Sequence, residues 1–257
     1  MINKPINLNQ ARQTLEQLVK TYHQKGFSLA RIDRVVFNDS EHIAHVYISE
    51  GFITNLLITG LQRTKPYVVS RELELHKGDL FRFERARNGL ENIFATGLFD
   101  AINLSVESRS NLHDIFIHVN EKPSYVFRFG IRYDDERSAR TFIELTDENV
   151  GGSANDLTMH LQYGGRDFKS SLHYSADRLF NTYLMSRFNL HYYASEHNAF
   201  YAFSKVGEYL RRTSGLDIDM GRQIARSGTL SALLRFEEID LDGISGTGYN
   251  TEIGRAS

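Results

Sequence analysis

Two histidines and a pair of aspartates are the first positions at which this chain could do chemistry. His42 and His45 are the closest pair among the ten histidines. On a β-strand, a separation of three residues turns the two rings to opposite faces, which opposes shared metal binding. Asp217 and Asp219 alternate with apolar residues, a pattern that indicates strand faces turned to water rather than an acid–base pair. We therefore expect no metal site and no catalytic residues.

Glycine-rich segments could instead hold a phosphate group or a nucleophile. Residues 151–153, Gly-Gly-Ser, lack the Lys-Ser/Thr ending of a phosphate loop, so a hairpin connection is expected there. The nucleophile elbow Gly-x-Ser-x-Gly does not occur, and residues 243–246 miss it by one position. The sequence therefore predicts a protein that is not an enzyme and holds no cofactor.

Composition narrows the class of protein further. The 257 residues carry 30 Lys and Arg against 32 Asp and Glu, so no excess of positive charge favours nucleic acid as a partner. There are no cysteines, which excludes disulfides and thiolate metal sites. No run of 18 apolar residues occurs, so no membrane-spanning helix is expected, and the polar stretch after Met1 does not resemble a signal peptide.

Helical and strand patterns alternate over the first 122 residues. An apolar stripe at helical spacing predicts a helix that ends at Gly26, followed by strands near 28–37 and 42–49. The next block reads as a strand over 52–59 and a helix that begins at Pro66 and is stopped by Gly78-Asp79. A second helix follows and ends at Gly97, and its apolar face carries Phe83, Ala86, Leu90, Ile93 and Phe94. Strands over 99–107 and 114–121 complete a strand–helix–helix–strand–strand unit.

From residue 123 onward the helical period disappears. In residues 125–133 every second residue is aromatic or isoleucine, alternating with Val126, Arg128, Gly130 and Arg132, and similar runs occur over 157–163 and 168–174. Later runs are longer or less regular, and polar segments at 194–198 and 211–215 suggest turns between them. About eight such strands are expected. Alternating segments of about ten residues with aromatic ends are typical of transmembrane β-barrels.

The unit over residues 51–122 resembles a POTRA (polypeptide-transport-associated) domain. The matching positions are Gly60, Arg63-Thr64, Arg71-Glu72, Gly78-Asp79 and Gly97-Leu98-Phe99. Such a domain, leading through Glu121-Lys122-Pro123 into amphipathic strands, resembles the outer-membrane protein assembly factor and bacterial surface antigen family.

The resemblance implies an organisation for the whole chain. It implies a partial α+β POTRA domain over 1–50, a complete β-α-α-β-β POTRA domain over 51–122, and the N-terminal half of an antiparallel transmembrane β-barrel over 123–257. Family barrels have sixteen strands, so about half are expected here, and we expect a chain truncated at both ends. It also implies a bacterial outer-membrane location with POTRA domains in the periplasm.

The implied function is insertion, assembly or translocation of proteins at the outer membrane. The implied partners are outer-membrane lipid, unfolded outer-membrane or secreted client polypeptides, and periplasmic assembly proteins, with no nucleic acid. Two alternatives remain open. The chain could be the transport module of a patatin-like phospholipase whose catalytic domain precedes residue 1, or a passive channel or binding protein.

Two strands are the candidate binding sites under this resemblance. In a POTRA unit the strand over 99–107 commonly lies at a sheet edge, where a client strand could add by β-augmentation. Apolar positions would anchor it to the helices while Asn103 and Ser105 face water. The expected edge residues are Phe99, Ile102, Asn103, Leu104, Ser105 and Val106.

The second candidate is the first barrel strand, which pairs weakly with the last strand in this family. Because a charge facing lipid at mid-membrane costs roughly 2–4 kcal/mol, its arginines should face the lumen and its apolar row the lipid. Gly130 either weakens this seam or makes room for a bulky lumenal neighbour. The seam residues are Tyr125, Phe127, Arg128, Phe129, Gly130, Ile131, Arg132 and Tyr133, and the strand ends in a charged turn at residues 134–137.

Overall fold

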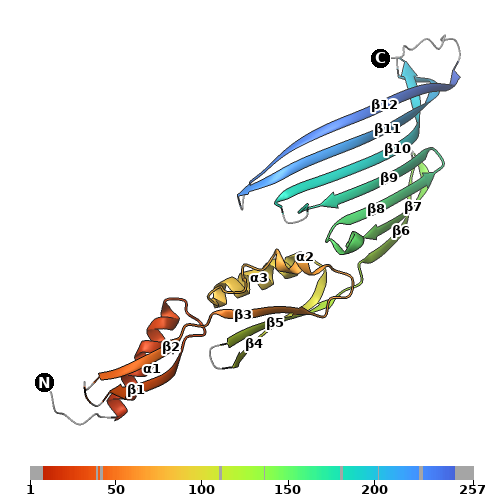
Figure 1. The fold of residues 1–257 in the computed structure, drawn as a ribbon. Helices are drawn as coiled ribbons and strands as arrows, with labels where there is room; N and C mark the ends of the chain where they lie inside the picture. Colours follow the sequence, from red (N-terminus) through yellow and green to blue (C-terminus); the bar gives the residue numbers. More distant parts are fainter. Residues whose placement is uncertain are drawn as a thin grey trace. The chain divides into compact units, whose positions relative to one another are not determined.

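The computed structural model describes residues 8–246 apart from residues 39, 41, 42, 110, 111, 136, 180, 181, 202, 226 and 227. The chain forms two compact units, Met1–Lys122 and Pro123–Ser257, which are coloured red to olive and green to blue in Figure 1. No helix in the described ranges is long and apolar enough to cross a membrane.

The first unit begins with one helix packed on a two-stranded sheet. Helix α1 (Leu8–Gln24) is followed by β1 (Arg31–Asn38) and β2 (Ile43–Ser49), which pair antiparallel from Arg31↔Ser49. Gly26 has a φ of +88° and ends the helix, because glycine enters the left-handed region without steric conflict. The predicted helix and both strands are confirmed.

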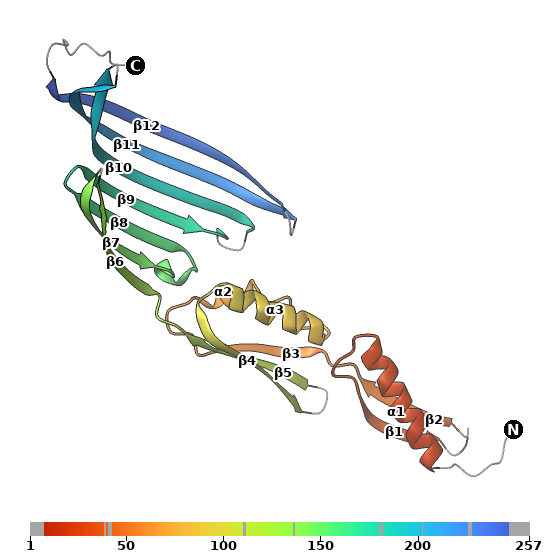
Figure 2. The same ribbon diagram turned by 180° about the vertical axis from the view of Figure 1, so that it is seen from behind.

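A three-stranded sheet covered by two helices completes this unit. Its elements are β3 (Ile53–Thr59), α2 (Pro66–Ser70), α3 (Phe83–Ala95), β4 (Phe99–Arg109) and β5 (Leu112–Glu121). The strand order is β3-β5-β4, with β3 parallel and β4 antiparallel to β5. Figure 2 shows both helices along one face of the sheet. The fully buried side chains of this core include Val68, Ile93, Ile115, Ile117 and Val119.

Two details of the expected helices are wrong. Helix α2 ends at Ser70 rather than at Gly78-Asp79. Leu73 and Leu75 are buried all the same, because an extended segment also places alternate residues on one face. On α3, Ala86 and Ile93 are buried as expected, together with Gly89, whereas Phe83 and Phe94, expected on the same face, are exposed.

The second unit is one antiparallel sheet of seven strands in chain order. They are β6 (Tyr125–Asp134), β7 (Ser138–Asp147), β8 (Asp156–Gly164), β9 (Asp167–Ala176), β10 (Leu184–Tyr201), β11 (Ser204–Ala225) and β12 (Gly228–Gly246). A short 3-10 turn, Val150–Gly152, lies in the β7–β8 connection, where a hairpin connection was expected. The sheet is open: no strand of the described residues joins β6 to β12. The predicted fold class is confirmed.

Strand limits within this sheet differ from the sequence expectation. Residues 194–198 and 211–215 are not turns but lie inside β10 and β11, and seven strands are described rather than about eight. Strand β7 was not among the predicted runs. The last pair between β9 and β10 is Asp167↔Ser195, so β10 and β11 continue well past the end of β9. Of the two misread segments, only residues 196–198 lie in that extension; residues 211–215 pair with residues 191–195 of β10, which in turn pair with β9.

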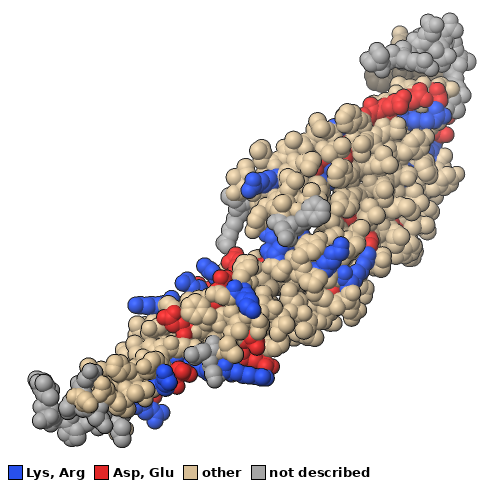
Figure 3. Space-filling model, viewed as in Figure 1, with Lys and Arg blue, Asp and Glu red and all other residues tan. Residues whose placement is uncertain are grey.

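Alternation gives this sheet two chemically different faces. The apolar face carries exposed side chains on neighbouring strands, among them Tyr125, Phe127, Phe129, Ile131, Tyr133, Ile143, Leu145, Met159, Leu161 and Tyr163. The polar face carries residues of the other parity, such as Arg128, Glu144 and His160. Figure 3 shows large uncharged areas over this sheet, whereas charged side chains are scattered over the first unit.

Candidate functional site: two strand edges

Strand β4 lies at an edge of the three-stranded sheet. It pairs only with β5 among the described strands, from Phe99↔Glu121 to Arg109↔Leu112. Ile102, Leu104 and Val106 are half-buried, whereas Asn103 and Ser105 are exposed. Phe99 is buried. The strand thus has its apolar side against the helices and its outer backbone edge without a strand partner in the described residues.

Strand β3 forms the opposite edge, which the sequence did not reveal. The start of β3 is covered by the segment before α3: Phe52 bridges to Leu80, and the Gly78 amide donates to the Ile53 carbonyl at 2.8 Å. Such cover blocks strand addition at that position. Strand β3 is at an edge because β5 lies in the centre of the sheet. Hydrophobic periodicity does not predict this order of strands.

Residues of the POTRA-like motif fix the loop after β3 to the end of β5. Backbone N–H groups of Gln62, Arg63 and Thr64 each donate to the Glu121 carboxylate at 3.0 Å. Burial alone would raise the pKa of Glu121, but these donors and the Thr64 hydroxyl outweigh it and hold the pKa below its ordinary value. A side chain at Gly60 would overlap the Val119 carbonyl, so the loop lies directly on β5.

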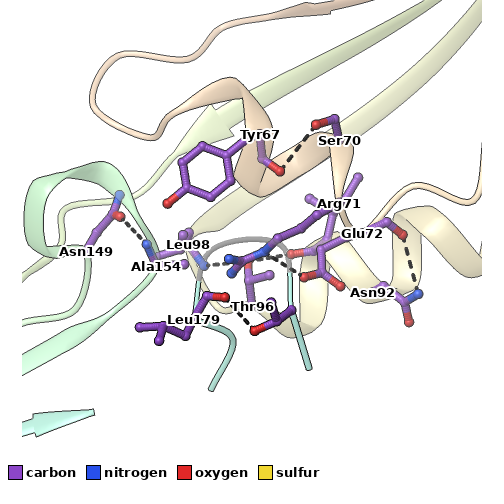
Figure 4. Close-up of polar contacts among 12 residues, drawn as sticks. Tyr67, Ser70, Arg71, Glu72, Asn92, Thr96, Leu98, Asn149, Ala154 and Leu179 are labelled. Atoms are coloured by element: carbon purple, nitrogen blue, oxygen red, sulfur yellow. Dashed lines mark hydrogen bonds and ion pairs between the residues drawn. The ribbon is translucent and has the colours of Figure 1, made fainter. Parts of the chain in front are cut away.

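A second motif pair fixes the helices. Arg71 and Glu72 form an ion pair of 3.2 Å with side chains only 7% and 10% exposed, and the Asn92 amide on α3 donates to the Glu72 carbonyl at 3.5 Å (Figure 4). The contact ties the segment after α2 to α3. Arg71 and Glu72 therefore have a structural explanation that needs no ligand.

Strand β6 is the edge of the seven-stranded sheet. It pairs with β7 from Tyr125↔Asp147 to Asp134↔Ser138 and with no other described strand. Its five apolar side chains, from Tyr125 to Tyr133, are between 61% and 79% exposed. On the opposite face Arg128 pairs with Glu144 at 2.6 Å, and Glu144 contacts His160 at 3.4 Å. Arg132 lies 3.9 Å from Asp134.

Gly130 lies in the middle of β6, opposite Phe142. A Cβ at position 130 would overlap the ring of Phe142, whose Cζ would lie at 2.8 Å. The ring in turn stacks on His160, with centroids 5.7 Å apart. This geometry matches the interpretation in which glycine makes room for a bulky neighbour on the polar face.

The residues considered first for chemistry have other partners. Asp217 accepts from Arg235 at 2.7 Å and from Asn189 at 3.2 Å, and Asp219 lies 3.5 Å from Arg187. His42 lies outside the described residues. Within the part of the chain that the structure describes, no three His, Asp or Glu side chains are placed to hold a metal ion.

Comparisons with known proteins find relatives with the same combination of domains. Residues 52–122 match the POTRA model, described as a surface antigen variable number repeat. An outer membrane protein assembly factor of Treponema pallidum (strain Nichols) is 23% identical over 172 residues, which is 62% of this chain and 20% of that protein. Outer membrane protein assembly factor BamA of Neorickettsia risticii (strain Illinois) is 21% identical over 209 residues, covering 78% and 28%.

The fold agrees with these sequence relatives. The crystal structure of BamA from Haemophilus ducreyi lacking POTRA domains 1–3 superimposes with a TM-score of 0.68 at 16% identity, covering 94% of this chain and 47% of that one. Together these matches support a protein of the outer-membrane assembly factor and surface antigen family, with POTRA and barrel elements. It spans between a fifth and a third of the length of these curated relatives.

Similarity to these proteins assigns an environment to each unit. The POTRA unit lies in the periplasm and the seven-stranded sheet in the bacterial outer membrane. The exposed apolar face is then the lipid-facing surface, and the polar face, with Arg128 and Glu144, is the lumenal one. Charged side chains gather on the lumenal face of β6 because lipid solvates them poorly.

Proposed function

We propose that this protein acts in the insertion, assembly or translocation of client proteins at the outer membrane. The observation that carries the proposal is the presence of two strand edges without described partners, β4 in the periplasmic unit and β6 in the membrane sheet. An edge offers unpaired N–H and C=O groups to any extended polypeptide. We also propose that residues 1–50, 51–122 and 123–257 are a partial POTRA domain, a complete POTRA domain and a barrel segment.

The periplasmic edge receives an extended client segment by β-augmentation. Backbone hydrogen bonds supply most of the affinity in this mode of binding, so little client sequence is required. The exposed Asn103 and Ser105 leave the outer side of β4 polar and accessible, which suits transient rather than permanent pairing. The core beneath β4 holds the edge in shape.

The membrane edge passes the client into lipid. Lipid tolerates no unsatisfied backbone groups, so the outer edge of β6 must pair either with the closing strand of a complete barrel or with a client strand. The apolar face of β6 remains compatible with lipid in both states. Exchange between these two partners would carry the client into the membrane.

A reversible crosslink tests this proposal. These 257 residues contain no cysteine, so a cysteine placed in β6 is unique among them; it is paired with one in the closing strand of the full-length protein, with any cysteine elsewhere replaced. We expect the oxidised protein to lose client insertion in liposomes and to regain it on reduction. Equal activity of the oxidised and reduced proteins would refute the membrane-edge step and would show that the barrel serves only as a membrane anchor.

A further inference from the structure

A nearly buried ion cluster lies on the lumenal face at the end of β6. Arg140 on β7 forms ion pairs with Asp134 of β6 and, at 3.3 Å, with Asp167 of β9. Asp167 also accepts from the Ser195 hydroxyl on β10 at 2.8 Å. The cluster thus links four strands, of which only neighbouring strands share backbone hydrogen bonds.

Burial makes this cluster different from the surface ion pairs of the sheet. The side chains of Arg140 and Asp167 are 12% and 7% exposed. Arg140 passes over Gly164 at the end of β8, where a Cβ would lie 3.3 Å from the Arg140 Cβ and would overlap its Cγ. Because residue 164 has no side chain, the arginine can extend from β7 over β8 to reach β9.

Two further contacts hold β6 to β7 below this cluster. Phe142 covers Gly130 in the middle of the strand, and Arg128 pairs with Glu144 nearer its start. The inner side of β6 is therefore held at three levels, while its outer edge has no described strand partner. Opening at the outer edge then requires no separation of β6 from β7.

We propose that Arg140 is a positioning residue that fixes the end of β6 against β9 and β10, so that the outer edge of β6 is a rigid template for an incoming strand. The client part of this inference rests on the proposed function. A strand held in one geometry loses less conformational freedom when a partner pairs with it. Arg140 itself touches no client; it acts through Asp134 and Asp167.

Three variants of the full-length protein test this role. Arg140→Met removes the bridge and leaves Asp167 and Asp134 only their more exposed partners, Arg137 at 3.5 Å and Arg132 at 3.9 Å. The triple variant Asp134→Asn/Arg140→Met/Asp167→Asn removes the bridge without leaving buried charges. Arg132→Met is the matched control, because Arg132 is also near Asp134, at 3.9 Å, but its side chain is 76% exposed and such pairs contribute little.

Amide hydrogen exchange of residues 131–134 and the rate of insertion of an unfolded outer-membrane protein into liposomes are measured for each variant. Arg140→Met should raise exchange and slow insertion by about tenfold each, because the nearly buried link from β6 to β9 is lost and the carboxylates keep only exposed cations. The triple variant should fold and still show both effects. Arg132→Met should match the wild type.

Wild-type insertion by the triple variant would overturn the positioning role, since the cluster would then serve only to avoid unpaired charge. Unchanged exchange in Arg140→Met would overturn it as well. If the wild-type protein itself inserts no client, the proposed function fails separately, and the exchange comparison alone decides whether Arg140 fixes β6.

Discussion

Gly130 and Phe142 face each other across the β6–β7 ladder, and the ring of Phe142 occupies the space that a side chain at position 130 would need. The relationship changes what a substitution at this position should do. A β-branched residue favours strand conformation by itself, which would strengthen pairing. Here that preference is opposed by overlap with an aromatic ring that is stacked on His160.

We therefore expect Gly130→Val to destabilise the barrel by about 1–3 kcal/mol, the usual cost of overpacking. Combining it with Phe142→Ala should recover part of that loss because the ring is no longer there. Urea unfolding in lipid bilayers, followed by heat-dependent gel mobility, measures both. A single variant as stable as the wild type would show that the ring moves aside without cost.

Proline on the β4 edge should impair client handling more than alanine does. Asn103 and Ser105 are exposed, so alanine at either position removes little, whereas proline removes a backbone donor or distorts the edge. Crosslinking of a bound client segment to the periplasmic unit measures the difference, and circular dichroism checks that the unit remains folded. Equal losses from the two substitutions would assign binding to side chains instead of backbone.

Glu121→Gln should lower the stability of the periplasmic unit by about 1–3 kcal/mol, because a charged acceptor of several N–H groups becomes neutral. The folded-state pKa of Glu121 is lowered, so its contribution is present above the unfolded pKa and is lost as pH falls through the folded pKa. Urea midpoints between pH 7 and pH 3 measure this. Glu107→Gln, in an exposed pair with Arg109, is the control and should leave the profile unchanged.

His113 should make the same unit sensitive to mild acid. Its side chain is 1% exposed and contacts Ser108 at 2.8 Å and Ser49 at 3.4 Å. Burial, and next the charge of Arg31, lower its pKa. Protonation therefore favours the unfolded chain, and stability should fall as pH drops below about 6.5, the ordinary value for histidine.

The His113→Gln variant provides the comparison for that effect. It should be less stable at pH 7.5 but lose less stability between pH 7.5 and pH 5 than the wild type. His76→Gln, at an exposed site, should keep the wild-type profile. A His113 variant with the full wild-type pH dependence would assign the effect to other groups.

Sequence periodicity predicted features that depend only on whether a side chain meets an apolar or a polar environment. The alternation over 125–133 predicted the two faces of β6, and capping residues predicted the end of α1 at Gly26. Strand β7 escaped because Phe142 and Ile143 are adjacent apolar residues on opposite faces. An aromatic residue at position 142 fits because Gly130 lies opposite it. That pairing depends on how β6 and β7 are aligned, which the sequence of neither strand specifies.

The ion cluster around Arg140 could not be predicted for a related reason. Asp134, Arg140 and Asp167 lie in or next to turns and look like ordinary solvated charges in the sequence. The path of Arg140 over Gly164 appears only when β7, β8 and β9 are aligned. The end of α2 at Ser70 was missed because Leu73 and Leu75 fit both a helical stripe and an extended segment.

The unequal strand lengths of the membrane sheet determine which residues are exposed outside the cell. Strand β6 starts directly after the periplasmic unit, so the ends of β6 and β10 face outward from the cell. Residues 196–201 of β10 continue past the last pair with β9, roughly 20 Å at about 3.3 Å per residue. Antibodies, phages and proteases added to intact cells should meet these ends of β10 and β11 before the turn between β8 and β9. Residues there do not contact lipid, so polar and charged substitutions should be tolerated. Immune selection can therefore change these strand ends while the membrane-embedded part of the sheet is retained.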